Sequence, residues 1–249
     1  MHPYLTAFTL AAQFLTRLPT PRLQDTTQED IARSVLAFPF VGLLIGLLLF
    51  IVTNALSEVP APLLAAILIT LWVAITGNLH MDGLADCADA LVGGQGQRER
   101  TLEIMKDPRS GAAAISSVVL VLLLKYAAMV YILNESLWLM IIVVPIISRS
   151  SILLFFLRME YARDKGLGSV YVENVSLHSV RWLLMAVAIA VLLFGGVLGF
   201  LLLLSAATFF WLYRAYWNKL VGGYTGDVIG AFVELLEAVL LIVAVISIT

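Results

Sequence analysis

The chain has 249 residues, of which 61% are hydrophobic and only 13% charged, and its formal net charge is −2. This composition, with a mean hydropathy of +0.98, excludes an ordinary water-soluble domain, in which apolar residues make up roughly 45–50%. The single cysteine, Cys87, excludes an internal disulfide and a cysteine-based zinc site, and no nucleic-acid partner is expected.

The apolar segments predict an all-α, polytopic membrane bundle. Residues 3–18 are apolar but end at Pro19 and Pro21, which predicts a helix lying in the membrane interface. About seven later segments are long enough to cross a hydrocarbon core, which takes roughly 20 helical residues. Gly195 and Gly196 separate the fifth from the sixth. We place these spans near residues 35–54, 61–79, 112–133, 137–157, 180–195, 197–216 and 228–248.

Lysine and arginine residues gather in alternate connections between these spans. They precede the first span and lie between the second and third, the fourth and fifth, and the sixth and seventh. The connections around Glu58, Glu135 and Gly195 carry none. The positive-inside rule therefore places the N-terminus in the cytoplasm and the C-terminus outside. Two further cations, Lys125 and Arg149, fall inside predicted spans, where charges usually face a bundle interior or a cavity.

Three carboxylates follow the second span, in the segment 77–89. Asp82, Asp86 and Asp89 are spaced i, i+4, i+7, so on a helix they fall within about 60° of one another. Like charges on one face repel, and carboxylate oxygens favour Mg²⁺ or Mn²⁺. A metal site is therefore the favoured interpretation. The alternative is a solvated acidic face, which is less expected beside an apolar span.

The last polar connection, residues 222–227, leads into a final apolar helix that carries acids. Asp227 and Glu234 are seven residues apart and share a helix face, whereas Glu237 is turned by roughly 80° from Asp227. Glu234 lies about 10 Å into its span and needs a partner there. The same metal cluster, or a second ion beside it, would supply one. Asp227 could instead cap the helix, but capping does not explain Glu234.

Clustered carboxylates, glycines and basic residues suit a substrate that bears phosphates. Metal ions would bridge the carboxylates to a diphosphate, basic side chains would neutralise other oxygens, and glycines would allow close backbone approach. Lys106 and Arg109, in a charged turn before the third span, are the favoured phosphate contacts. For Arg98 and Arg100, a purely topological role is equally expected. The chain contains no Walker-type phosphate loop and no serine-hydrolase motif.

The segment His80-Met81-Asp82-Gly83-Leu84-Ala85-Asp86 resembles the His-x-Asp-Gly-Leu-Ala-Asp signature of the adenosylcobinamide-GDP ribazoletransferases, also called cobalamin-5′-phosphate synthases. The likeness continues in order along the chain. It covers Phe14–Pro19, Phe38–Gly42, Leu102–Asp107, Gly166–Gly168, and Gly222–Asp227 with Gly230 and Glu234. One departure is Asn78, where the family usually has glycine.

The resemblance implies a Mg²⁺-dependent enzyme that joins adenosylcobinamide-GDP to α-ribazole, or to its 5′-phosphate, and releases GMP. This reaction belongs to the last steps of nucleotide-loop assembly in vitamin B12. The resemblance implies a single transmembrane catalytic domain over residues 1–249, in a bacterial or archaeal cytoplasmic membrane with the active site facing the cytoplasm. The two substrates and the lipid bilayer are the expected partners. A homo-oligomer, or a complex with other corrinoid pathway enzymes, is left open.

Three groups of site residues follow from the motifs. The expected catalytic residues are His80, Asp82 and Asp86; the metal ligands are Asp82, Asp86, Asp89, Asp227 and Glu234; and the substrate or phosphate contacts are Lys106, Arg109, Gly166, Gly168, Thr225 and Gly226. His80 would accept the proton of the attacking hydroxyl. Equally, it could orient Asp82 or donate to a phosphate.

A second enzyme family offers an alternative. The CDP-alcohol phosphotransferases carry Asp-Gly-x2-Ala-Arg-x8-Gly-x3-Asp-x3-Asp, and the segment 82–85 begins this pattern correctly. However, Asp86 and Cys87 stand where that motif has alanine and arginine, and Arg100 and Ile104 stand where it has aspartates. The CDP-alcohol pattern is therefore broken at four positions.

An ion-coupled transporter is the alternative from another class. It would use Glu234 and Glu237 together with Lys125 and Arg149. Transporter sites lie near the membrane midplane, often between repeated halves. In this chain the acids gather near one face, and the two halves show no sequence repeat.

Overall fold

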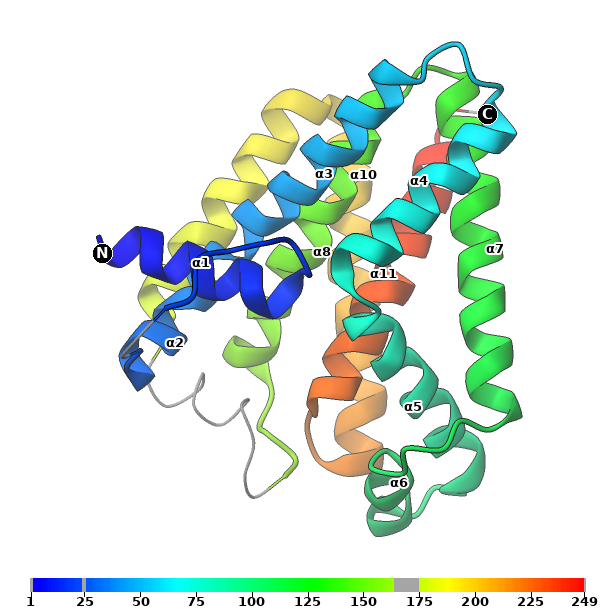
Figure 1. Cartoon of the computed structure of the whole chain (residues 1–249). Coiled ribbons are helices and arrows are strands. Elements are labelled where there is room, and N and C mark those ends of the chain that lie inside the picture. Colours follow the sequence, from blue (N-terminus) through cyan, green and yellow to red (C-terminus); the bar gives the residue numbers. More distant parts are fainter. Residues whose placement is uncertain (1, 24–25, 164–174, 249) are drawn as a thin grey trace.

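The computed structural model describes residues 2–23, 26–163 and 175–248. In this part of the chain the regular structure is helical, apart from one isolated bridge between Tyr161 and Tyr224, which confirms the predicted all-α class. The elements are α1 (Pro3–Leu15), α2 (Gln28–Ser34), the 3-10 helix η1 (Val35–Ala37), α3 (Phe38–Ala55), α4 (Ala61–Thr76), α5 (Leu79–Gly93), α6 (Arg98–Ile104), α7 (Ala112–Asn134), α8 (Trp138–Arg158), α10 (Leu177–Val221) and α11 (Gly226–Ile246) (Figure 1).

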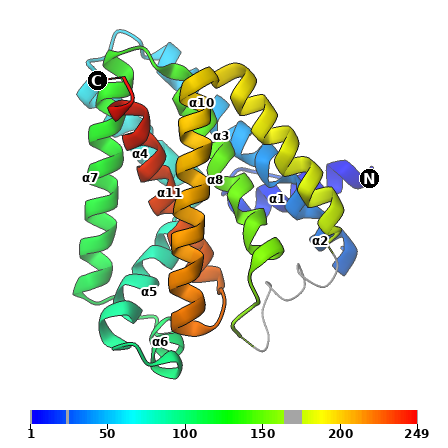
Figure 2. The same ribbon diagram turned by 180° about the vertical axis from the view of Figure 1, so that it is seen from behind.

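The number of membrane-spanning helices is close to the predicted one. Over the described ranges, five helices are long and apolar enough to cross a membrane, or six if α4 and α5 count as one bent span. As a straight helix, α10 would be roughly 68 Å long, more than twice the hydrocarbon core. At Gly196, φ is 54° and ψ is −132°, values that glycine adopts readily. Figure 2 shows α10 folding back into two arms, which are the predicted fifth and sixth spans.

An elbow after α4 sets the position of the acidic helix. Gly77 and Asn78 both have φ of 61°, in the left-handed region that glycine and asparagine tolerate best. The chain turns by 90° between α4 and α5. Asn78 therefore adopts, without a glycine, the positive φ that this elbow requires. As a result α4 ends at Thr76, and α5 lies with α6 toward one end of the bundle (Figure 1).

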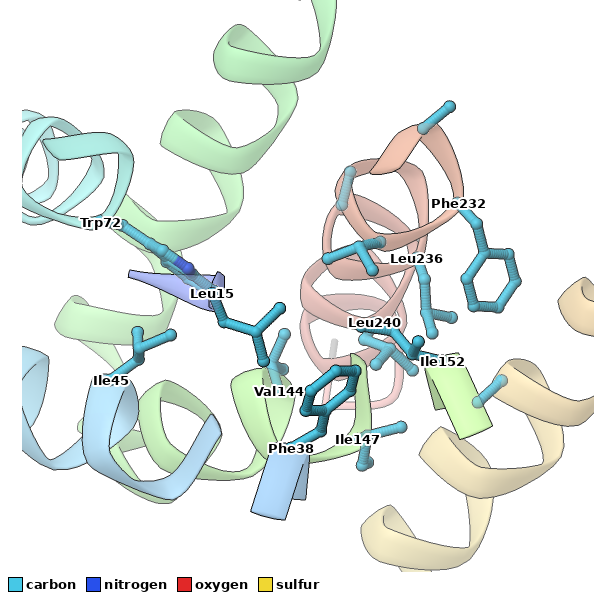
Figure 3. Packing of buried hydrophobic residues seen from close by; sticks show 14 of the residues in the cluster. Leu15, Phe38, Ile45, Trp72, Val144, Ile147, Ile152, Phe232, Leu236 and Leu240 are labelled. Carbon is cyan, nitrogen blue, oxygen red and sulfur yellow. The ribbon is translucent and has the colours of Figure 1, made fainter. Parts of the chain in front are cut away.

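The core is shared by α3, α8 and α11. Figure 3 shows Phe38 and Ile45 of α3, Val144 and Ile147 of α8, and Leu236 of α11 in one apolar cluster, with α8 packed against both α3 and α11. Lipid chains are as apolar as leucine, so membrane helices associate largely through close packing. Two glycines of α3 provide it here. At Gly46, an added Cβ would lie 2.7 Å from the Cα of Ile142, and at Gly42 it would meet the carbonyl oxygen of Pro145.

Two of the connections predicted to be cytoplasmic lie at the same end of the bundle. Figure 1 shows α5, α6 and the turn between α10 and α11 at this end. The turns after α3 and α7, the bend at Gly196 and the C-terminus lie at the opposite end (Figures 1 and 2). The predicted α1 forms but ends at Leu15, and it lies across the side of the bundle beside α2 and α3.

Candidate functional site

Two glycines bring the acidic helix against the last helix. At Gly83 of α5, an added Cβ would lie 2.7 Å from the carbonyl oxygen of Asp227. At Gly230 of α11, it would lie 3.1 Å from the carbonyl oxygen of His80. Without these glycines the two backbones could not approach so closely. The crossing places the start of α11 beside the acidic face of α5, which confirms that the last helix packs against the acidic one.

Three carboxylates lie near this crossing, close enough for the charges of Asp82 and Asp227 to act on Asp86. Asp82 is exposed, while Asp86 and Asp227 are half-buried. Burial raises the pKa of Asp86 to about 6, and the negative charges of Asp82 and Asp227 act in the same direction. Negative charge is thus concentrated toward one end of the bundle, where a cation would be stabilised.

Thr225, not Asp227, caps α11. The Thr225 Oγ1 accepts a hydrogen bond from the backbone N–H of Val228 at 3.2 Å. Thr225 is fully buried, so the structure gives its hydroxyl a capping role rather than an open phosphate contact. Gly226 is exposed, and an added Cβ there would meet nothing within 4 Å. Because Thr225 supplies the cap, the capping alternative for Asp227 is wrong, and the Asp227 carboxylate binds other partners.

The main partner of Asp227 is Arg163, which follows the end of α8. The Nη2 of Arg163 lies 2.7 Å from the Asp227 Oδ2. Sequence reasoning counted Arg163 only among the positive residues of a loop. Nothing in the sequence alone relates it to Asp227, because 64 positions separate them. The one available signal was its place between the predicted fourth and fifth spans, a connection expected on the same side of the membrane as the acidic segment 77–89.

Asp89 supports a neighbouring helix. Its carboxylate accepts hydrogen bonds from the backbone N–H groups of Gly111 at 2.5 Å and Ala114 at 2.9 Å. Gly111 is the N-cap residue of α7 and Ala114 lies in its first turn, where backbone N–H groups lack a helical partner. Asp89 therefore caps α7 from α5, and both of its oxygens are engaged in that contact.

The predicted basic contacts lie on the surface beside this cap. Lys106 and Arg109 are exposed. Arg109 donates from Nε and Nη2 to the two oxygens of Asp107, at 2.9 and 2.6 Å. These hydrogen bonds lower the pKa of Asp107 to about 2. Lys106 and Arg109 lie at the correct end of the bundle, but no contact joins either to the three carboxylates. The predicted contacts Gly166 and Gly168 lie outside the described residues.

Glu234 belongs to a second, buried group of charges between α7, α8 and α11. The Nζ of Lys125 binds Glu234 and lies 2.5 Å from the Glu237 Oε2. Glu237 also pairs with Arg149, and it accepts a hydrogen bond from the Ser148 Oγ at 3.0 Å. The partner that Glu234 requires is thus a lysine within the bundle. The structure gives no contact between Glu234 and Asp227.

His80, in the first turn of α5, lies near the cations of the buried group. Its side chain is buried, and its Nδ1 has no hydrogen-bond partner in the described part of the chain. Burial lowers the pKa of His80 well below its ordinary value, and the charges of Arg149 and Lys125 add to this effect. These surroundings favour the neutral form of the imidazole.

The carboxylates fit a metal ion that the substrate completes. Over the residues that the structure describes, no group of three or more His, Cys, Asp or Glu side chains forms a metal site by itself. Magnesium usually binds through one or two carboxylates together with waters and substrate phosphates. Asp82, Asp86 and Asp227 offer such a partial set, with hard oxygen donors at the bundle end.

Comparison with known proteins settles the family. The sequence profile described as cobalamin-5-phosphate synthase matches residues 7–245. The chain belongs to the cobalamin-5-phosphate synthase family. Because the match covers nearly the whole chain, it decides against the CDP-alcohol phosphotransferase and transporter alternatives. It also agrees with the resemblance carried by the segment 80–86.

Several relatives named adenosylcobinamide-GDP ribazoletransferase are similar over most of their length. One from Pseudomonas putida is 45% identical over 230 residues, which is 92% of this chain and 94% of the relative. One from Pseudomonas paraeruginosa is 46% identical, and one from Pseudomonas aeruginosa is 45% identical, each covering 97% of this chain and 98% of the relative. No solved structure matches the chain significantly.

Proposed function

We propose that the chain is an adenosylcobinamide-GDP ribazoletransferase, the activity for which its relatives are named. One structural observation supports this most directly. The family's signature aspartates on α5 converge with Asp227 of α11 at a single end of a membrane bundle. This arrangement suits the transfer of a phosphorus centre from a nucleotide diphosphate to an alcohol.

The proposed reaction breaks one phosphorus–oxygen bond and forms another. The 3′-hydroxyl of α-ribazole, or of its 5′-phosphate, attacks the phosphorus attached to cobinamide. The bond from that phosphorus to the bridging oxygen breaks, and GMP leaves with that oxygen. The hydroxyl proton passes to a base. In-line displacement at such a centre depends chiefly on positioning and on electrostatic stabilisation.

The residues at the bundle end would have two roles, metal binding and phosphate contact. Bound Mg²⁺ would neutralise negative charge on the diphosphate. Asp82, Asp86 and Asp227 would hold that ion against the substrate. The exposed Lys106 and Arg109 would contact phosphate oxygens, and Arg109 would exchange its hydrogen bonds to Asp107 for them.

The decisive assay follows GMP. The purified full-length chain, given adenosylcobinamide-GDP, α-ribazole and Mg²⁺, should release GMP in step with corrinoid product. Excess EDTA should stop the reaction, and added Mg²⁺ should restore it. If purified, folded protein releases no GMP with either α-ribazole or its 5′-phosphate, the proposed function is wrong.

A kinetic measurement can distinguish a catalytic role of His80 from a binding role. Because its imidazole lies on α5, less than one turn before Asp82 and nearly two turns before Asp86, we propose that it accepts the hydroxyl proton. His80→Asn should then lower kcat by roughly 10²–10⁴, with little change in the KM for adenosylcobinamide-GDP. The measurement is steady-state GMP release at pH 7. A rise in KM with kcat preserved would instead make His80 a binding residue.

The membrane orientation is also testable. We propose that the bundle end bearing α5 and α6 faces the cytoplasm, since the positive connections gather there. The only native cysteine, Cys87, is buried. A cysteine introduced at the exposed Gln97 should therefore react with an impermeant maleimide only after the cells are made permeable, and the wild-type chain serves as the control. Labelling in intact cells would show that the orientation is inverted.

A further inference from the structure

The ion pair between Arg163 and Asp227 engages one of the carboxylates that we propose to hold the metal ion. The two side chains are 21% and 23% exposed, and the atoms are 2.7 Å apart. Arg163 also acts on Asp86, because its positive charge opposes the rise in that residue's pKa. One guanidinium thus offsets part of the negative charge that a divalent cation would otherwise neutralise.

Hydrogen bonds fix the backbone that leads to Arg163. The backbone N–H of Ala162 donates to the carbonyl oxygen of Tyr224 at 2.9 Å, and the N–H of Tyr224 donates to that of Glu160 at 3.0 Å. Arg98 donates to the carbonyl oxygen of Ala162 at 3.2 Å. The segment is therefore held against the turn before α11. Because the backbone just before Arg163 is fixed, its side chain extends to Asp227 from a defined position.

The guanidinium of Arg163 retains unused donor capacity. Its Nε is buried and has no hydrogen-bond partner among the described residues. A planar guanidinium binds phosphate through two parallel N–H donors, and Nε with Nη2 forms one such pair. Asp227 engages Nη2 alone. The group is thus placed for a bidentate partner that the protein itself does not supply.

We propose that Arg163 is a phosphate-binding residue that Asp227 holds in place until metal and substrate arrive. When a divalent cation takes the Asp227 carboxylate, the guanidinium transfers to non-bridging oxygens of the nucleotide diphosphate. This inference rests on the proposed function, and it assigns to Arg163 the recognition of the diphosphate. It also predicts that Arg163 and the metal ion compete for one carboxylate.

Metal binding and catalysis should therefore respond in opposite directions to the loss of Arg163. In Arg163→Gln, Mn²⁺ measured by electron paramagnetic resonance without substrate should bind about two- to fivefold more tightly, the range for a partly exposed ion pair. The KM for adenosylcobinamide-GDP should rise about tenfold or more, because a charge-assisted contact is lost. Arg163→Lys keeps the positive charge but loses the two parallel N–H donors of the guanidinium. Its Mn²⁺ affinity should therefore return to the wild-type value, while its KM for adenosylcobinamide-GDP should stay high.

Arg158→Gln is the matched control. It removes a positive charge from the end of α8, where Arg158 stacks on Trp211 at 5.8 Å, away from the carboxylates. Both measurements should stay at wild-type values. Weaker or unchanged Mn²⁺ binding in folded Arg163→Gln would overturn the inference. If the wild type released no GMP while Arg163→Gln still tightened Mn²⁺ binding and weakened retention of the GDP-bearing substrate, the proposed reaction would fail and the role of Arg163 would stand.

Discussion

Replacing Asp86 by asparagine should abolish GMP release while leaving the chain folded and inserted in the membrane. Asparagine keeps the shape of the side chain but removes the charge that would hold the metal ion. Loss of one group that stabilises developing charge costs about 10²–10³ in rate, and loss of a metal ligand at least as much. The measurement is GMP release together with membrane yield and thermal melting in detergent.

The raised pKa of Asp86 determines the expected effect on stability. Its pKa of about 6 in the fold exceeds the ordinary 3.8, so ionisation is less favourable in the folded chain than in the unfolded one. The metal-free protein therefore loses stability through this group as the pH rises from about 4 to 6. Asp86→Asn removes that loss. Without metal at pH 7, the variant should melt no lower than the wild type.

Two other acids provide controls for Asp86. Glu103 on α6 is 74% exposed and lies 3.6 Å from Arg100, so Glu103→Gln should leave both turnover and melting unchanged. Asp89 caps α7, and Asp89→Asn should lower stability by about 1 kcal/mol while turnover persists. Full turnover in Asp86→Asn with ordinary Mg²⁺ dependence would remove Asp86 from the metal site.

The spacing of residues in the sequence predicted the part of the site that lies on a single helix, α5. The positions of Asp82 and Asp86 follow from helical periodicity, and the turn before Asp227 follows from its glycines and Thr225. The contact between α5 and α11 was less obvious. It depends on Gly83 and Gly230, which allow close backbone approach over a long sequence separation.

The errors came from partners that are distant in the sequence. Glu234 was expected at the metal because a buried carboxylate needs a cation, and the requirement was correct. The cation is Lys125, 109 positions away, and periodicity within one helix cannot identify such a partner. For the same reason Arg163 was missed and Asp89 was assigned to the metal. Only the packed bundle shows that Asp89 meets the first turn of α7.

The largest effect on stability is expected from Lys125. Lys125, Arg149, Glu234 and Glu237 are all buried, and their formal charges cancel. Lys125→Met would leave Glu234 as a buried, uncompensated charge. Removing one partner of a buried pair destabilises a protein by about 3–5 kcal/mol. The variant should therefore accumulate poorly in the membrane and melt well below the wild type.

A second substitution should reverse most of this loss. In Lys125→Met combined with Glu234→Gln, the remaining charges are Arg149 and Glu237, which pair with each other. The double variant should thus recover membrane yield and melting temperature relative to Lys125→Met. Lys219→Met, at an exposed position of α10, should change neither quantity. Because these buried charges compensate one another, GMP release should return along with stability. A double variant as unstable as Lys125→Met would mean that the lysine contributes through its packing on Trp72, 5.2 Å from its Nζ, rather than through charge balance.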